Sequence, residues 1–126
     1  MDKLKKKKEI FNNCILFKNL NLIGKKWTIF ILLKIFQNKE QKVNYSEFKN
    51  ELNGITSKIL SLRLNELIKY KILEKRKEKI NNVVYTYYYL TESGNKLKPI
   101  INSFIRWNKK YNKCKMEKYC LLKINK

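Results

Sequence analysis

The segment SKILSLRLNELIKY combines an apolar stripe with polar side chains at helical spacing. Leu60, Leu64 and Leu67 recur at intervals of three or four residues and predict a side that faces the core. The opposite side would present hydroxyl, ammonium and amide groups, which can bond to base edges and phosphates. The residues that we expect on this outward side are Ser57, Lys58, Ser61, Leu62 and Asn65, with Thr56 at the start of the helix.

Several of these side chains suggest particular contacts. The ammonium group of Lys58 can reach the acceptor edge of a guanine, and the hydroxyl of Ser61 can donate or accept. Leu62 would suit a thymine methyl group, although a single exposed leucine is also common on surfaces and needs no ligand. Thr56 and Ser57 lie where the helix would begin, and the free N–H groups there favour phosphate.

A second group of candidate contacts lies on a predicted β-hairpin. Residues 72–79 and 83–90 predict two strands, the second of them rich in β-branched and aromatic residues. The two asparagines between the strands suit the positive-φ positions of a tight turn. We expect the tip to enter the minor groove or follow the DNA backbone, the alternative being a solvated charged surface. The tip residues are Lys77, Lys79, Asn81 and Asn82.

Three tyrosines of the second strand, Tyr85, Tyr87 and Tyr89, would share one face. Aromatic rings in a row can stack on single-stranded bases. We favour the other interpretation, in which they pack against helices or against a second copy of the chain.

Cys14 is a candidate sensor of oxidants or electrophiles. Lys18 lies one helical turn further on, and Lys25 and Lys26 are close in sequence. Nearby cations activate a thiol. The alternative is a buried cysteine that acts as a small hydrophobic residue.

Composition points to a polyanionic partner. The 126 residues include 30 Lys and Arg against 10 Asp and Glu, which gives a net charge of +20. Solubility alone needs a net charge of only about 2–8. Nucleic acid is the first candidate partner and an acidic membrane surface the second. Residues 1–13 contribute the basic run KLKKKKE, which is either a solvated helix start or an arm that touches phosphate.

Several other classes of protein do not fit. The chain has no His, and its three Gly are far apart, so it lacks His-based catalytic sites and a Gly-rich phosphate loop. Cys114 and Cys120 form no metal-binding pattern with Cys14. No apolar stretch approaches the about 20 residues of a membrane span. We therefore expect a cytoplasmic, nucleoid-associated protein that is not an enzyme, needs no cofactor or metal and does not bind membranes.

The order of the predicted elements is typical of one winged-helix domain over residues 1–126. Residues 25–38 predict a buried helix and residues 38–42 a loop. The fold class is α+β, mostly α, with a two-stranded β wing and terminal helices for dimerisation. The ranges are a helix-turn-helix at about 44–70, a wing at about 72–90, and terminal helices at about 5–22 and 92–118.

Three strings of residues and two single residues carry a family resemblance. Cys14 is followed by IGKKWT (23–28), then by YSEFKNELNGITSKILSLRLNELIK (45–69), LTESGNKLKPI (90–100) and Trp107. This pattern resembles the HxlR family of winged-helix transcription regulators, which is similar to the MarR regulators. The family usually has a Pro after the Cys, where this chain has Ile15, and a Pro pair in the wing, where this chain has none.

The resemblance implies a homodimer that is held together by its terminal helices. Several members of the family sense thiol oxidants or aldehydes through the N-terminal Cys, so the resemblance also implies such a role for Cys14. It also implies that Arg63 holds a phosphate, the alternative being a surface ion pair. The last helix carries a seam of large residues that one small domain would not cover. The seam residues expected in the dimer interface are Leu97, Ile101, Phe104, Trp107 and Tyr111.

The sequence thus predicts a transcription regulator that binds double-stranded DNA sequence-specifically as a homodimer. A small molecule or an oxidant is the expected kind of effector. Two recognition helices would read half-sites roughly 34 Å apart. The alternative is an architectural, chromatin-like protein that coats DNA without sequence preference.

Overall fold

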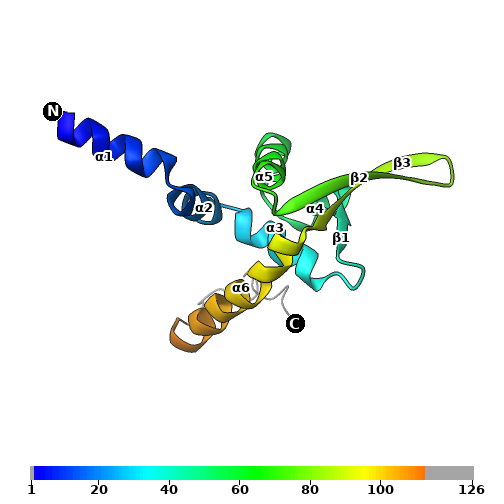
Figure 1. Cartoon of the computed structure of the whole chain (residues 1–126). Coiled ribbons are helices and arrows are strands. Elements are labelled where there is room, and N and C mark those ends of the chain that lie inside the picture. The colour runs from blue at the N-terminus through cyan, green and yellow to red at the C-terminus, as the bar shows by residue number, and fades with distance from the viewer. Residues whose placement is uncertain (1, 113–126) are drawn as a thin grey trace.

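The computed structural model describes residues 2–112, except for the side chains of residues 2 and 10–12, and it is an α+β fold that is mostly helical (Figure 1). The body of the fold contains the helix-turn-helix and the sheet, and the first and last helices project from it. In chain order the elements are α1 (Asp2–Asn13), α2 (Ile15–Ile23), α3 (Thr28–Gln37), β1 (Lys42–Asn44), α4 (Tyr45–Glu51), α5 (Ser57–Lys69), β2 (Leu73–Ile80), β3 (Val83–Leu90) and α6 (Glu92–Tyr111).

Helix α3 is at the centre of the core, as the apolar run predicts. Ile31, Leu32 and Ile35 are fully buried. One side of α5, the inner face of the sheet and one side of α6 pack around them in a single cluster. Burial of this apolar surface is the main force that holds the helix-turn-helix in place.

The helix-turn-helix forms where the sequence predicts it. Asn44 caps α4 by accepting a hydrogen bond from the N–H of Glu47 (2.8 Å). Gly54 has φ +91°, a conformation that favours glycine, and it makes the turn between the two helices. Thr56 then caps α5 by accepting from the N–H of Ile59 (3.2 Å).

The hairpin belongs to a three-stranded antiparallel sheet with the order β1-β3-β2. Asn81 and Asn82 have φ values of 52° and 66°, so the predicted turn is confirmed. The prediction of a loop through residue 42 was wrong at its end, because Lys42 begins β1. Val43 in this strand is fully buried opposite Tyr88, and three residues are too few to show an alternating pattern.

The N-terminal segment forms two helices rather than the single helix expected over 5–22. Cys14 has an extended conformation (φ −73°, ψ 121°) and separates α1 from α2. The preceding residues, Asn12 and Asn13, are weak helix formers, which suits a break at this point.

At the other end, Thr91 caps α6 through the N–H of Gly94 (3.1 Å). A Cβ on Gly94 would lie 2.3 Å from the carbonyl oxygen of Ile72, so only glycine allows α6 to start this close to the base of the wing. Helix α6 is described to Tyr111, and the predicted residues 113–118 lie outside the described part of the chain. Within that part, no helix has the length and apolar character needed to cross a bilayer.

Candidate nucleic-acid interface

The outward side of α5 is open to solvent. Its side chains do not contribute to the core, which α5 contacts through Leu60, Leu64 and Leu67. The exposed residues on this side are Ser57, Lys58, Leu62 and Asn65, and Leu62 has 46% of its surface exposed. A polar helix face with one exposed leucine is therefore available to a partner.

Tyr45 of α4 holds the first two turns of α5 through hydrogen bonds. Its hydroxyl donates to the carbonyl oxygen of Ser57 and lies within hydrogen-bond distance of the hydroxyl of Ser61 (both 3.2 Å). Ser61 is consequently half-buried rather than fully exposed. No local pattern in the sequence marks Tyr45, because its partners are 12 and 16 residues away.

Arg63 forms a surface ion pair, one of the two roles considered for it. Its guanidinium group donates to Glu66 (2.7 Å) and to the carbonyl oxygen of Lys26 (3.2 Å). Lys25 donates to the same carboxylate (2.6 Å). Partial burial raises the pKa of Glu66, but hydrogen bonds from Lys25 and Arg63 outweigh it, and the pKa is lower than usual. The cluster ties α5 to the linker before α3.

The two faces of β2 carry different charges, because successive side chains of a strand point in opposite directions. One face, which continues the core side of the sheet, carries Lys75, Lys77 and Lys79, opposite Tyr88, Thr86 and Val84. We call these three residues the wing lysines. The other face carries Glu74, Arg76 and Glu78. Among the described residues, the wing lysines form no salt bridge, whereas Arg76 pairs with Glu74 (2.6 Å).

Opposite charges and aromatic rings cover this other face. Lys42 pairs with Glu78 (2.9 Å) and lies over the ring of Tyr87 (4.5 Å from its centroid). Arg76 lies over the ring of Tyr89 (4.9 Å), and the Tyr89 hydroxyl donates to Glu78. Hydrogen bonds from Tyr89 and Lys42 hold the pKa of Glu78 below its usual range.

The three tyrosines lie outside the core cluster and do not pack against helices of their own protomer, so that part of the expectation was wrong, while packing against a second copy of the chain stays a prediction. Tyr85 and Tyr87 are neighbours on the outer face (ring centroids 6.3 Å apart), and Tyr87 and Tyr89 contact the cations named above. Only alternate residues of β3, such as Tyr88 and Leu90, reach the core.

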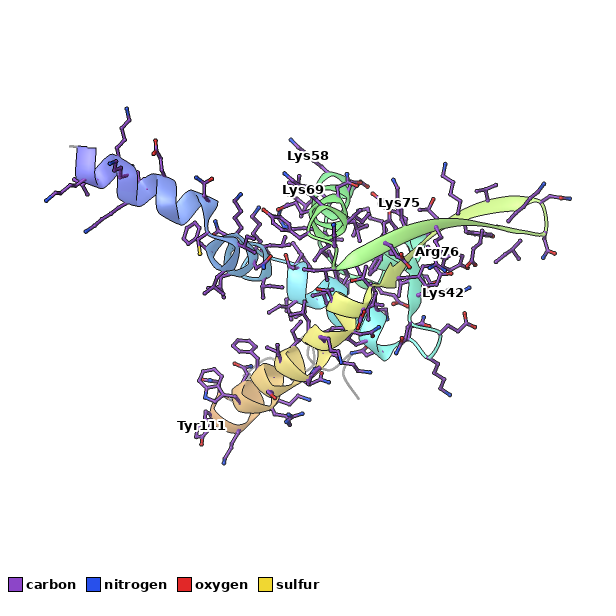
Figure 2. All side chains as sticks on the ribbon, viewed as in Figure 1. Lys42, Lys58, Lys69, Lys75, Arg76 and Tyr111 are labelled. Atoms are coloured by element: carbon purple, nitrogen blue, oxygen red, sulfur yellow. The ribbon has the colours of Figure 1, made fainter. Side chains whose placement is uncertain are left out.

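The wing lysines and the exposed side of α5 face the same way. In Figure 2, Lys58, Lys69 and Lys75 lie on one side of β2, and Lys42 and Arg76 lie on the other. At the tip of the hairpin, Lys77, Lys79 and the two turn asparagines, Asn81 and Asn82, are all exposed, as are Ile80, Val83 and Val84. The fold therefore brings the two predicted groups of contact residues onto one surface. Lys75, the third wing lysine, was not among the predicted contact residues, and its two-residue spacing from Lys77 on the same strand is the signal that marks it.

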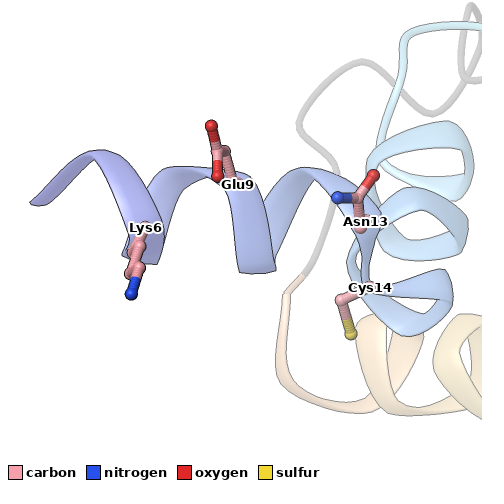
Figure 3. A pocket seen from close by; sticks show the side chains of 4 residues that line it. All are labelled: Lys6, Glu9, Asn13 and Cys14. Carbon is pink, nitrogen blue, oxygen red and sulfur yellow. The ribbon is translucent and has the colours of Figure 1, made fainter. Parts of the chain in front are cut away.

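Cys14 is exposed at the joint between α1 and α2 (Figure 3). Its carbonyl oxygen accepts from the N–H of Lys18 (3.0 Å). A shallow, open pocket beside the thiol is lined by Lys6, Glu9 and Asn13 of α1. The thiol is thus accessible, with one lysine of α1 among its neighbours. Cys114 and Cys120 lie outside the described residues, and within residues 2–112 no group of His, Cys, Asp and Glu could hold a metal ion.

Helix α6 divides the predicted interface residues between two sides. Ile101 is 3% exposed and belongs to the protomer's own core, and Leu97 packs against that core. The prediction was therefore wrong in placing Ile101 in the seam; residues four apart, such as Ile101 and Ile105, share the inward side. On the outward side, Phe104 and Trp107 are each 54% exposed and Tyr111 is 66% exposed. Their rings form a continuous ladder, with centroids 5.9 and 6.3 Å apart.

A family model described as HxlR-like helix-turn-helix matches residues 22–116. This range contains α3, the helix-turn-helix, the wing and α6. The chain belongs to the HxlR-like helix-turn-helix family. The resemblance seen in the sequence is thereby confirmed.

Relatives and solved structures agree with this assignment. An HTH-type transcriptional regulator of Methanocaldococcus jannaschii is 34% identical over 101 residues, which cover 77% of this HxlR-like chain and 85% of the relative. The regulator YdeP of Bacillus subtilis is 30% identical over 103 residues, covering 80% and 76%. The oxidised form of the redox regulator HypR superposes with a TM-score of 0.68 at 26% identity, covering 80% of this chain and 100% of that one.

Proposed function

We propose that this protein is a transcription regulator that binds duplex DNA as a homodimer, with α5 in the major groove and the wing along the backbone. The observation that carries the proposal is the common surface formed by the exposed side of α5 and the three wing lysines, from which the acids of β2 point away. Membership of a helix-turn-helix family and relatives named as transcriptional regulators support it.

Helix α5 would supply the base contacts. In a helix-turn-helix, the first turns of the second helix reach the base edges. Lys58 would bond to a guanine and Leu62 would contact a thymine methyl group, while Ser61 and Asn65 have hydrogen-bonding groups on the same side. The free N–H groups at Thr56 and Ser57 favour a phosphate. Arg63 is not among the proposed phosphate contacts, because its guanidinium group already binds Glu66.

The wing would bind the backbone. Lys75, Lys77 and Lys79 have no acidic partner within residues 2–112, so a phosphate would face no competing carboxylate on that face. Asn81 and Asn82 at the tip add amide groups that can enter the minor groove or bond to phosphate.

Dimerisation would cover the exposed apolar surface. The ladder of Phe104, Trp107 and Tyr111 lies on α6, and Ile15, Leu16 and Leu20 on α2 are each at least 62% exposed. Contiguous exposed aromatic and aliphatic side chains mark a protein interface. In a symmetric dimer both recognition helices would face one side of the DNA.

Cys14 would make the regulator responsive to oxidants. Its thiolate would attack one oxygen of hydrogen peroxide and break the O–O bond, giving a sulfenic acid at Cys14 and a hydroxide ion that takes a proton from solvent to become water. Exposure of the thiol at the joint of two helices supports this role, as does the similarity to a redox regulator. Mass spectrometry after mild peroxide or aldehyde treatment tests it. Cys14 should be modified and DNA binding should change, and Cys14→Ser should abolish the change while Cys114→Ser and Cys120→Ser do not; an inert Cys14 would contradict the role.

The rival function is non-specific coating of DNA, for which the charge of +20 would suffice. Selection of bound duplexes from a random pool, followed by hydroxyl-radical footprinting, separates the two functions. A regulator should enrich a two-fold symmetric sequence and protect two half-sites about one helical turn, or roughly 34 Å, apart. A coating protein would enrich no sequence and protect the duplex uniformly.

A further inference from the structure

Helix α1 stands apart from the rest of the fold. It projects from the body (Figure 1), and the described side chains at positions 3–9 are all exposed. Five of these seven residues are Lys, with Leu4 and Glu9 as the others. The family model begins at residue 22, so α1 precedes the part of the chain that defines the family. Neither the core nor the shared family fold explains this helix.

The lysines of α1 repel one another, and Glu9, which lies three and four residues after Lys6 and Lys5, offsets only part of this repulsion. Lys3 lies three and four residues before Lys6 and Lys7, and Lys5 lies three before Lys8, so like charges are neighbours on the helix surface. Like-charge pairs at this spacing destabilise a helix, and a helix of 12 residues is marginal without packing. Among the described residues, none of these lysines has an ion-pair partner. A polyanion would remove the repulsion.

We propose that α1 is a phosphate-binding arm, which binds the backbone of the same duplex that α5 and the wing bind. This inference rests on the proposed function. It adds a third contact surface, and one that reads no sequence, because lysine–phosphate contacts carry no base information.

The placement of α1 suggests which stretch of DNA it binds. Figure 1 shows α1 and the wing extending to opposite sides of α5, and α1 on the same side as α6. Since α6 carries the aromatic ladder, the arm would point toward the partner subunit and the middle of a symmetric site. A helix of 12 residues is about 18 Å long, roughly the length of five base pairs.

A pair of matched triple variants tests the arm. Lys3→Gln, Lys5→Gln and Lys8→Gln together remove three charges from α1, while Lys39→Gln, Lys96→Gln and Lys109→Gln remove three exposed charges elsewhere. Each variant is titrated with a selected duplex between 50 and 200 mM salt. The arm variant should lower the slope of log affinity against log salt by about 2–3 and weaken binding about 10- to 100-fold, since each phosphate contact contributes about 0.9 to the slope. The control variant should change affinity less than about threefold.

Hydrogen exchange and footprinting give independent readouts. Adding duplex to the full-length protein should slow amide exchange over residues 3–9, because phosphates would neutralise the lysines of α1 and the helix would open less often. The arm variant should lose backbone protection between the two half-sites and keep protection within them. Circular dichroism and thermal melting should show that both variants remain folded.

The possible outcomes distinguish a failure of the arm proposal from a failure of the proposed function. If the parent binds the selected duplex and the arm variant matches the control variant, the arm proposal is wrong and the proposed function stands. If the parent binds no duplex, both fail. If the arm lysines matter for binding to anionic phospholipid vesicles but not for binding to duplex, the partner of α1 is a membrane and the proposal is overturned.

Discussion

At the scale of single residues, Lys58 and Leu62 carry the sequence selectivity that we propose. Replacing either by Ala should reduce discrimination at one base pair by about 1–3 kcal/mol. Lys69→Ala is the matched control, because Lys69 is an exposed lysine at the other end of α5. It should weaken binding to all sequences equally. Binding of each variant to a set of single-base-pair substitutions measures the difference. If Lys58→Ala and Lys69→Ala gave the same profile, Lys58 would not be a base contact.

Glu78 gives the wing a dependence on pH. Hydrogen bonds from Tyr89 and Lys42 lower the pKa of Glu78 in the folded protein. Its contribution to stability is therefore fully present above the ordinary glutamate pKa of about 4.3 and is lost as the pH falls through the lower, folded-state pKa. Thermal melting from pH 7 to pH 3 should show a steeper loss for the parent than for Glu78→Gln. Equal slopes, or an NMR titration that places the pKa of Glu78 at its ordinary value, would contradict this.

The exposure of the proposed contact residues was predictable from the sequence, but the contacts that α5 makes with other elements were not. Periodicity alone placed Lys58, Leu62 and Asn65 on the exposed side of a helix. Tyr45 of α4 donates to the carbonyl oxygen of Ser57 on α5, and Lys25, which precedes α3, donates to Glu66 of α5. Such contacts depend on how the helices pack, and no local pattern encodes them.

At the scale of elements, the wing is expected to bind DNA with one face only. Lys77 and Arg76 are adjacent in sequence and lie on opposite faces of β2. Lys77→Gln should lower the salt slope of DNA binding by about 0.9, the value for one phosphate contact. Arg76→Gln removes the same charge from the face where Glu74 and Tyr89 already engage it, and should leave the slope unchanged. Titrations at several salt concentrations measure both slopes. Equal effects would mean that only the total charge of the wing matters.

Elements with a strong pattern were predicted well and weak ones were not. The buried helix α3, the helix-turn-helix and the Asn-Asn hairpin have clear periodicity, caps or turn residues. Strand β1 has three residues, and its place in the sheet depends on pairing with a strand 45 residues away. The break at Cys14 interrupts a segment in which charged and apolar residues alternate irregularly.

At the scale of the whole molecule, the aromatic ladder on α6 should hold two copies together. Phe104→Ser with Trp107→Ser should convert a dimer into a monomer in sedimentation experiments, because the ladder would no longer bury its rings. Ile80→Ser with Val83→Ser removes a similar exposed apolar pair at the wing tip and should leave the dimer intact. A dimer that survives the loss of both ladder residues would place the interface elsewhere.

The most direct test of selective DNA binding is a titration at physiological salt. It compares the DNA upstream of the protein's own gene, or a selected duplex, with random duplex of equal length. A regulator that reads sequence with α5 should bind the specific duplex at least about 10³-fold more tightly than the random one. A ratio near one with a steep salt dependence would contradict sequence reading and would mean that the charge alone binds DNA.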